Sequence, residues 1–168
     1  MTLRNQQGVT LVELLVAITI FAIVVAIAVP TFKEANERNQ IKTVARQIKD
    51  ELAKARITAM EKNTPVLLAF PAPNGDSSRS YQISVDSNDN CEVDGGEERK
   101  QIDMGKVFFS NNTLTKNTAG DHILQWDTRG YPQKKDGSFT NGTITISAFD
   151  NQFEIIISRV GNIRINKP

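Results

Sequence analysis

Two hydrophobic patterns follow one another over the first third of the chain. Residues 9–29 are apolar almost throughout, and Glu13 is their only ionisable side chain. At about 1.5 Å per residue, a helix of this length reaches about 31 Å, the thickness of a bilayer's hydrocarbon core. After Pro30, apolar residues recur every three or four positions among charged ones, at Ile41, Val44, Ile48, Leu52, Ala55 and Ala59. The pattern predicts one long helix over residues 9–63, kinked or locally loosened at Pro30.

Beyond residue 63 the helical period gives way to short β-branched and aromatic segments separated by turn residues. These segments predict strands over residues 66–70, 80–85, 102–109, 123–127, 143–149, 152–158 and 162–165. Asp150-Asn151 and Gly161-Asn162 mark chain reversals, and FEIIIS indicates a strand buried on both faces. We therefore expect an α+β fold. The hydrophobic half of the helix projects, and the amphipathic half packs on an antiparallel β-sheet or β-sandwich.

The carboxylate of Glu13 needs a partner if residues 9–29 enter a bilayer. An isolated acid near the centre of a membrane helix costs roughly 2.5 to 3.5 kcal/mol, and less toward the helix end. One interpretation is an ordinary single-span anchor whose Glu13 reaches the headgroups. Another is a secretory signal peptide with a cleavage site near Ala26 and Ala28. Arg4 before the span indicates a cytoplasmic N-terminus.

Composition narrows the candidate chemistry. The chain has 168 residues and a net charge of +1, which carries little information about partners. Cys91 and His122 are the only residues of their types, and neither a phosphate loop nor a nucleophile triad is visible. The acidic stretch 86–100 is expected to be a hydrated surface loop without EF-hand spacing. We predict no enzymatic activity, no cofactor and no metal site.

The N-terminal segment resembles that of type IV pilins and type II secretion pseudopilins. The resemblance rests on GVTLVE, which runs from Gly8 through Val9 to Glu13, followed by the apolar run and Pro30. It implies that a membrane-embedded prepilin peptidase cuts between Gly8 and Val9, removing a leader of residues 1–8, and then methylates the amino group of Val9. Val9 departs from the family's usual Phe at this position. Three segments follow on this interpretation: an assembly helix over 9–30, an amphipathic helix over 31–63 and a β-rich domain over 64–168.

Cleavage would supply the missing partner of Glu13. The new ammonium group of Val9 lies four residues, or about one helical turn, from the carboxylate. The two groups can pair within one chain, or between one subunit's Glu13 and its neighbour's Val9. Removing one partner from a buried ion pair costs roughly 3 to 5 kcal/mol, so such a pair suits selection of register in a fibre. Pro30 would then be a flexible point during extraction and packing.

The rest of the chain is similar to the minor pilins and pseudopilins of the GspH, FimT and FimU family. The similarity rests on the order of LAKARITAMEKNTPVLL, QWDTRGYP, GTITIS and FEIIISRVGNIRI. It implies a pilin-like fold and a membrane-inserted precursor that primes or caps a type IV pilus or a type II secretion pseudopilus. The expected partners are other pilin or pseudopilin subunits, the prepilin peptidase and an inner-membrane assembly platform. The expected location is the bacterial inner membrane, with one span and a periplasmic C-terminal domain, and then the fibre.

A second interpretation is a DNA receptor displayed on a pilus. Arg159, Arg164 and Lys167, joined by Lys134 and Lys135, would form a basic edge that holds phosphates. In several relatives the last strand reads Gly-Arg-x-Arg, and here Asn162 replaces the first Arg. The simpler alternative is a set of solvated charges that discourages edge-strand aggregation. A membrane-anchored enzyme, a third alternative, requires Cys91, His122 and carboxylates to cluster in the fold.

Overall fold

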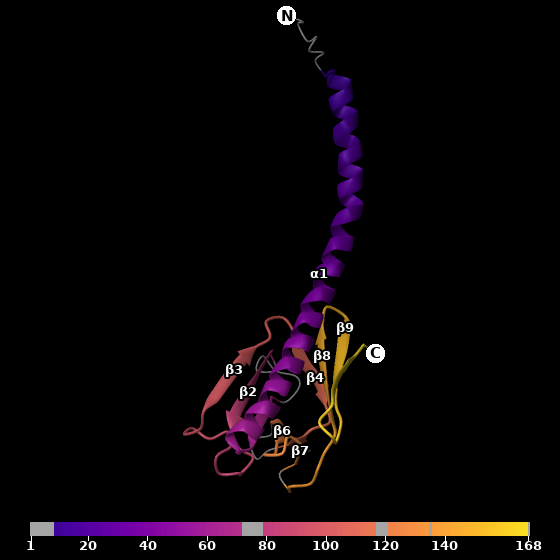
Figure 1. The fold of residues 1–168 in the computed structure, drawn as a ribbon. Coiled ribbons are helices and arrows are strands. Elements are labelled where there is room, and N and C mark those ends of the chain that lie inside the picture. The colour runs from indigo at the N-terminus through magenta and orange to yellow at the C-terminus, as the bar shows by residue number, and fades with distance from the viewer. Residues whose placement is uncertain (1–8, 72–78, 117–120, 135, 168) are drawn as a thin grey trace, which may run out of the picture. The chain divides into compact units, whose positions relative to one another are not determined.

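A computed structural model describes residues 9–71, 79–116, 121–134 and 136–167 (Figure 1). The chain divides into two compact units, Met1–Glu37 and Arg38–Pro168. The helix α1 (Leu11–Lys62) contributes to both, and it is helical through Pro30. It ends where Asn63 takes a positive φ of 49° and the Thr64 N–H donates to the Ala59 carbonyl at 3.2 Å, a pattern that commonly terminates helices.

Two antiparallel sheets make up most of the second unit in the described residues. The first sheet has the order β3-β2-β1-β6-β5, and β7 also pairs with β6. Its strands are β1 (Val66–Phe70), β2 (Ser80–Val85), β3 (Arg99–Asp103), β5 (Thr115–Lys116), β6 (His122–Trp126) and β7 (Pro132–Gln133). The second sheet has the order β10-β9-β8-β4. Its strands are β4 (Phe108–Asn112), β8 (Gly142–Ala148), β9 (Asn151–Ile157) and β10 (Ile163–Asn166).

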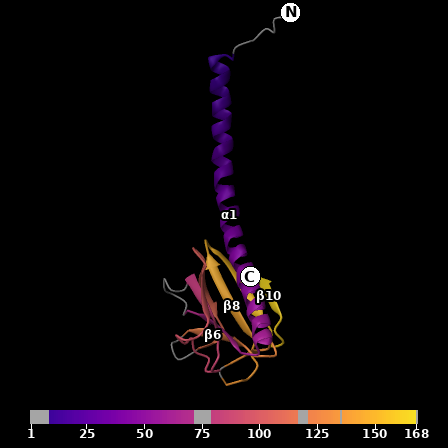
Figure 2. The same ribbon diagram turned by 60° about the vertical axis from the view of Figure 1, so that its left-hand side comes forward.

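One core joins α1 to both sheets within the unit Arg38–Pro168 (Figure 2). The helix contributes one buried stripe, made of Ile41, Ala45, Ile48, Leu52, Ala55 and Ala59. Five of the six residues that the sequence period predicts to be buried lie in this stripe. An amphipathic helix buries its apolar face when it packs on a sheet. An aromatic group links the two sheets, since the Phe109 ring of β4 lies 5.1 Å from Phe70 and 6.2 Å from Tyr81. The α+β prediction, a long helix packed on antiparallel sheets, is confirmed.

The single strand predicted over residues 102–109 is wrong. The chain turns between Asp103 and Phe108, and β3 and β4 belong to different sheets. Gly105 adopts a φ of +63°, and its N–H donates to Asp103 Oδ1 at 2.9 Å. A short acidic side chain followed two residues later by glycine is a turn signal, and the apolar residues on both sides obscure it.

Two further details of the second sheet differ from the predictions. FEIIIS is not buried on both faces, because Ile156 is 37% exposed between buried Ile155 and Ile157. The β8–β9 reversal occurs one residue earlier than predicted, at Phe149 and Asp150, which have φ values of 50° and 60°. Positive φ at both central residues defines the turn that matches the twist of a two-residue hairpin.

Candidate assembly helix and surface sites

Thr10 caps the N-terminal end of α1. Its hydroxyl accepts the N–H of Glu13 at 3.2 Å, and its carbonyl accepts the N–H of Leu14 at 3.1 Å. The sequence Thr-x-x-Glu at this place is the pattern of a capping box, a signal that the sequence analysis missed. Glu13 therefore lies in the first turn, where the helix dipole favours a negative charge. Its carboxylate makes no hydrogen bond or ion pair with any described residue.

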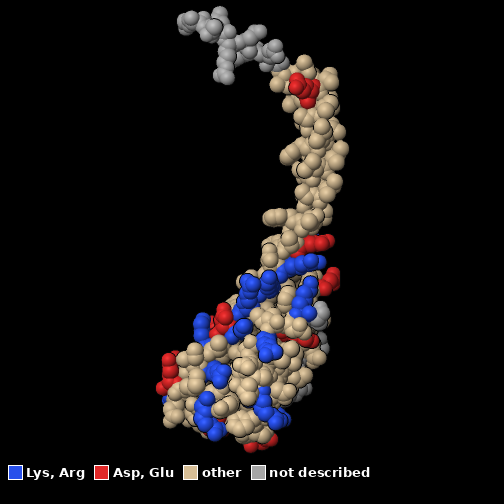
Figure 3. All heavy atoms as spheres, turned by 45° about the vertical axis from the view of Figure 1, so that its right-hand side comes forward, with Lys and Arg blue, Asp and Glu red and all other residues tan. Residues whose placement is uncertain are grey.

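The apolar side chains of α1 in the first unit have no protein partner in the described chain. Leu11, Phe21 and Phe32 are 76%, 69% and 77% exposed, and residues 9–32 are exposed throughout. The only candidate membrane span in the described residues lies in α1, by length and composition. Figure 3 shows this segment as a column almost free of charged side chains. Such a helix requires lipid or other apolar helices around it, because large exposed apolar surfaces are unstable in water.

The polar groups of this helix segment are largely satisfied internally. The Thr19 hydroxyl donates to the Leu15 carbonyl at 2.8 Å, and the Thr31 hydroxyl donates to the Ile27 carbonyl at 3.3 Å. Pro30 carries no N–H, so the helical hydrogen bond to the Ala26 carbonyl is missing at that point. Because the segment is otherwise a continuous helix, its backbone N–H and C=O groups are paired within it, as an apolar environment requires. Gly8 lies outside the described residues.

The cations predicted to form a basic edge are exposed but spread along β10. Arg159 precedes the strand, Arg164 lies within it opposite Ile156, and Lys167 follows it. At about 3.3 Å per residue, the two ends of the strand are about 10 Å apart. Lys134 is exposed next to β7 in the other sheet, and Lys135 lies outside the described residues. The described cations form an extended row, with no single convergent pocket.

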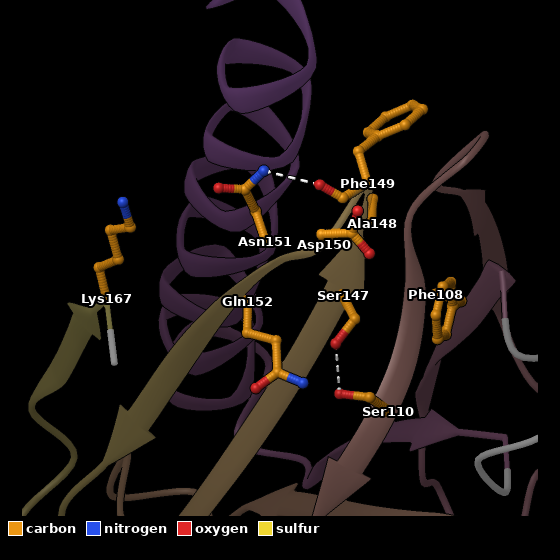
Figure 4. A pocket seen from close by; sticks show the side chains of 9 residues that line it. All are labelled: Phe108, Ser110, Ser147, Ala148, Phe149, Asp150, Asn151, Gln152 and Lys167. Carbon is orange, nitrogen blue, oxygen red and sulfur yellow. Dashed lines mark hydrogen bonds between the residues drawn. The ribbon is translucent and has the colours of Figure 1, made fainter. Parts of the chain in front are cut away.

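A groove of about 780 Å³ lies beside the β8–β9 turn (Figure 4). Phe108 and the turn residue Phe149 give it apolar surface, and Lys167 lines it from the end of β10. Ser147 donates a hydrogen bond to Ser110 across β8 and β4, with an Oγ–Oγ distance of 2.8 Å. The groove therefore has hydroxyl and amide lining but no convergent set of acids, bases or nucleophiles.

The acidic loop 86–98 closes on its own side chains. Asp86 is fully buried, and its carboxylate accepts the N–H groups of Asn90 and Cys91 at 3.1 and 2.9 Å. Gln125 of β6 donates a third hydrogen bond to it at 2.9 Å. Asp94 accepts the side-chain amides of Asn88 and Asn90 at 2.9 and 2.7 Å. A buried carboxylate is tolerated when several N–H donors surround it, which explains Asp86 without a cation.

The predicted absence of EF-hand spacing in this loop is wrong. The oxygen-bearing side chains at positions one, three, five, nine and twelve of such a loop correspond to Asp86, Asn88, Asn90, Asp94 and Glu97. Cys91 occupies the position of the usual glycine and adopts a φ of +59°. In this structure the spacing lets Asp86 accept the N–H groups of Asn90 and Cys91 and so forms the turn of the loop. No group of three or more His, Cys, Asp or Glu in the described residues is arranged to hold a metal ion.

Cys91 and His122 do not form a catalytic pair. The Cys91 thiol donates to Gln125 Oε1 at 3.2 Å, on the face of β6 that carries Ile123. His122 belongs to the alternate set of β6 positions, and its Nδ1 lies 3.3 Å from the Leu114 carbonyl. Because successive side chains of a strand point to opposite faces, the sheet separates the two groups. The clustering that the enzyme interpretation requires is therefore absent in the described part of the chain.

Comparison with known families identifies the class of protein to which the chain belongs. Residues 3–29 match the model of the prokaryotic N-terminal methylation motif, and residues 44–161 match that of type II transport protein GspH. The chain belongs to the GspH family. It is thus a minor pilin or pseudopilin, as the resemblance in its sequence implies. The GspH match covers residues 44–62 of α1 and every strand of both sheets except β10.

Individual relatives agree with this assignment. The pilin-like protein PilA1 of Thermus thermophilus is 27% identical over 164 residues, which cover 96% of this chain and 99% of that protein. The type IV minor pilin FimU of Pseudomonas aeruginosa superposes with a TM-score of 0.55 at 17% identity, over 77% of this chain and 90% of FimU. The minor pseudopilin EpsH of Vibrio cholerae gives 0.53 at 14% identity, over 76% and 96%. The two structures show a shared fold.

Proposed function

We propose that this GspH-family subunit is a membrane-inserted precursor that is cut between Gly8 and Val9, methylated at Val9, and assembled into a type IV pilus or a type II secretion pseudopilus. It primes or caps the fibre and needs the prepilin peptidase, sister subunits and the inner-membrane assembly platform. Its C-terminal domain is periplasmic before assembly. The observation that carries the proposal is the wholly exposed apolar stretch of α1 with an unpaired Glu13 in its first turn.

The geometry of the N-terminal end supports the proposed pairing. Thr10 already caps the helix, so cleavage before Val9 would leave a free ammonium group one residue before the cap of α1. In a bundle, the ammonium group of one subunit and the Glu13 carboxylate of its neighbour neutralise each other in an apolar environment. The helices then exchange lipid contacts for contacts with one another.

Processing is tested by two substitutions at the proposed cleavage site. Gly8→Val places a branched side chain next to the scissile bond, and Val9→Phe introduces the residue usual in the family. We expect Gly8→Val to accumulate uncut in the membrane and to be missing from sheared fibres. Val9→Phe should be cut and assembled at least as well as the parent chain. Uncut Gly8→Val protein present in fibres at the parent level would refute the proposal.

A second candidate function, DNA binding by the fibre, is favoured by the exposure of Arg159, Arg164 and Lys167, which make no ion pair in the described residues. Three cations, one on β10 and one beyond each of its ends, give modest affinity that weakens with salt. A gel-shift experiment with the detergent-purified chain tests it. Binding at low salt that decreases in Arg164→Ala supports the function, and the absence of any shift at low salt refutes it.

A further inference from the structure

Two oppositely charged surfaces belong to the unit Arg38–Pro168. Residues 38–49 of α1 contain four cations and no acid, whereas the acidic loop 86–98 contains six acids and no cation. We call the four cations the basic row: Arg38, Lys42, Arg46 and Lys49. All four are exposed, and none makes a hydrogen bond or an ion pair with a described residue. The small net charge of the chain therefore hides a strong separation of charge.

The basic row lies on the flank of α1 that faces the turn between β9 and β10. At about 3.6 residues per helical turn, its members lie about a quarter of a turn from the buried stripe. Arg56 lies on the same flank, and it donates to the carbonyl of Gly161, in that turn, at 3.1 Å. The row thus occupies a lateral position beside the second sheet, at the N-terminal end of α1 in this unit.

The acidic loop lies on the opposite flank, at the C-terminal end of the helix. Lys62, the last residue of α1, pairs with Glu98 of the loop. Glu51 lies on the same flank as Lys62, and it pairs with Lys100 of β3 at 3.3 Å. Figure 1 shows β3 and β9 on opposite sides of α1. About 20 Å of helix separates Lys62 from Lys49, the nearest member of the basic row, so the two surfaces cannot meet within one chain.

The acidic loop keeps its negative charge although its side chains accept hydrogen bonds. The donors to Asp86 and Asp94 are amide N–H groups, which are neutral and leave the charge of each carboxylate intact. Lys62 offsets one unit of charge at Glu98. Asp89 and Glu98 are exposed, so the loop presents carboxylates at its outer surface.

We propose that the basic row of one copy of this chain docks on the acidic loop of a second copy, so that consecutive copies stack head to tail. The observation that carries this inference is charge complementarity between two surfaces of the same chain that cannot reach each other within it. The inference rests on the proposed assembly into a fibre, and it names one neighbour of the chain there. The segment that primes or caps the fibre then contains more than one copy.

The contact joins different surfaces of two identical chains. Because the two surfaces lie at opposite ends of the unit, an axial offset between parallel copies brings the acidic end of one level with the basic end of the next. A docked pair leaves one basic row and one acidic loop free. Such a heterologous contact does not close on itself, and it continues along a fibre.

The strength of the contact depends on the surroundings of the two chains. Single ion pairs on a protein surface contribute little to association, and salt screens them. In a fibre the α1 helices already hold neighbouring subunits together, so the local concentration of the two surfaces is high. Complementary charge then selects the neighbour and its register. The contact should therefore be sensitive to salt and to charge reversal.

Zero-length crosslinking of sheared fibres tests which groups are in contact. A carbodiimide joins an amine to a carboxylate that it touches, so it should couple Lys42 or Lys49 of one copy to the acidic loop of another. We expect a product of twice the mass of the chain, with peptides from residues 38–49 joined to peptides from residues 86–98. The pair Lys62 and Glu98 gives an internal reference within one chain. Lys42→Arg with Lys49→Arg keeps both charges without the amines, and it should lose the product while entering fibres at the parent level.

An exchange of charges tests complementarity. Two copies with different epitope tags are co-expressed, and the fraction of one copy captured with the other is measured in detergent at low salt. Lys42→Glu with Lys49→Glu should reduce capture at least fivefold, as should Asp89→Lys with Glu98→Lys. All four substitutions in one chain should restore at least half of the parent capture, because the pairs form again with reversed polarity.

The control for this exchange reverses two cations of the β10 region. Arg164→Glu with Lys167→Glu should leave capture within twofold of the parent, and it should not rescue Asp89→Lys with Glu98→Lys. Fluorescence of Trp126, the single tryptophan, verifies that each variant keeps the folded core.

Each contrary outcome has its own meaning. Crosslinks that join the basic row only to a different subunit would overturn the inference, as would a fourfold variant captured no better than the two double variants. A parent chain that is present in fibres but gives neither the double-mass product nor salt-sensitive capture would refute the inference alone. A parent chain that shows salt-sensitive capture but is missing from fibres would refute the proposed function and support the contact between copies.

Discussion

Replacing Glu13 by Ala separates membrane insertion from fibre assembly. In the bilayer the substitution removes a carboxylate from an apolar helix, so the precursor becomes more stable there. In the fibre it removes one partner of the proposed pair and leaves the ammonium group of Val9 without a counter-charge. Both effects act in the same direction, toward retention in the membrane. We therefore expect Glu13→Ala to be inserted and cut normally but to be depleted from fibres.

The helix geometry gives the size of the effect. Val9 lies one residue before the cap Thr10, and a segment of four residues covers about 6 Å when it is helical. At this separation two unit charges attract by about 3 kcal/mol if the effective dielectric constant is about 20. Loss of one partner from a buried pair costs roughly 3 to 5 kcal/mol, which agrees with that figure. About 3 kcal/mol corresponds to roughly a hundredfold change in the equilibrium between membrane and fibre.

The assay compares the amount of chain in sheared fibres with the amount in the membrane. Two further substitutions isolate the charge: Glu13→Gln keeps the size of the side chain without its charge, and Glu13→Asp keeps the charge on a shorter stem. Glu13→Gln should be depleted like Glu13→Ala, and Glu13→Asp should retain much of the parent level. A ratio for Glu13→Ala or Glu13→Gln within twofold of the parent would refute the pairing.

Three predictions concern the folded unit, and the fluorescence of its single tryptophan reports each. Ile48→Ala leaves a cavity at a fully buried position, so the free energy of unfolding should decrease by about 2 to 5 kcal/mol, and an unchanged midpoint in urea would contradict the core described above. Gly142→Ala places a Cβ 2.3 Å from Leu114 Cδ2, so it should lower the melting temperature, and adding Leu114→Ala should recover part of that loss; additive losses would contradict the clash. Burial, and to a lesser extent Glu51, raises the pKa of Tyr81, so the folded chain keeps a proton that the unfolded chain loses above about pH 10, and stability should decrease as pH rises from there. Tyr81→Phe should reduce that alkaline loss in denaturation curves, and an identical pH profile would contradict it.

The elements that local patterns specify strongly are predictable from the sequence. The buried stripe of α1 follows from its period, and β1 and β2 have the predicted bounds because turn residues flank them. The turn after β6 also agrees, since Asp127 accepts the N–H groups of Arg129 and Tyr131 at 3.0 and 2.7 Å, as expected for a turn residue. Short-range hydrogen bonding and burial are enough to determine these features.

Features that depend on contacts between distant segments are not predictable in this way. Arg56 donates to the Gly161 carbonyl at 3.1 Å, and its guanidinium lies 5.8 Å from the centre of the Trp126 ring. Gly130 and Gly161 leave room for it, since an added Cβ at either position would lie about 3 Å from Arg56. The two-residue strands β5 and β7 likewise exist only because β6 is beside them. No local signal identifies such partners.

Among the candidate sites, too, only those with a local signal could be predicted from the sequence. Glu13 could be singled out from the sequence because one charge in an apolar run is conspicuous, and its cap Thr10 was visible in Thr-x-x-Glu. The burial of Asp86 could not be predicted in this way, because one of its three hydrogen-bond donors is Gln125 of the distant strand β6.

Intact-mass and N-terminal peptide analysis of the chain in purified fibres tests the central claim most directly. The account predicts that the chain begins at Val9 and carries a methyl group on its amino nitrogen, in company with other subunits. A working fibre whose copy of this chain still begins at Met1 and retains Gly8 would contradict the account, because no ammonium group would then be available to neutralise Glu13.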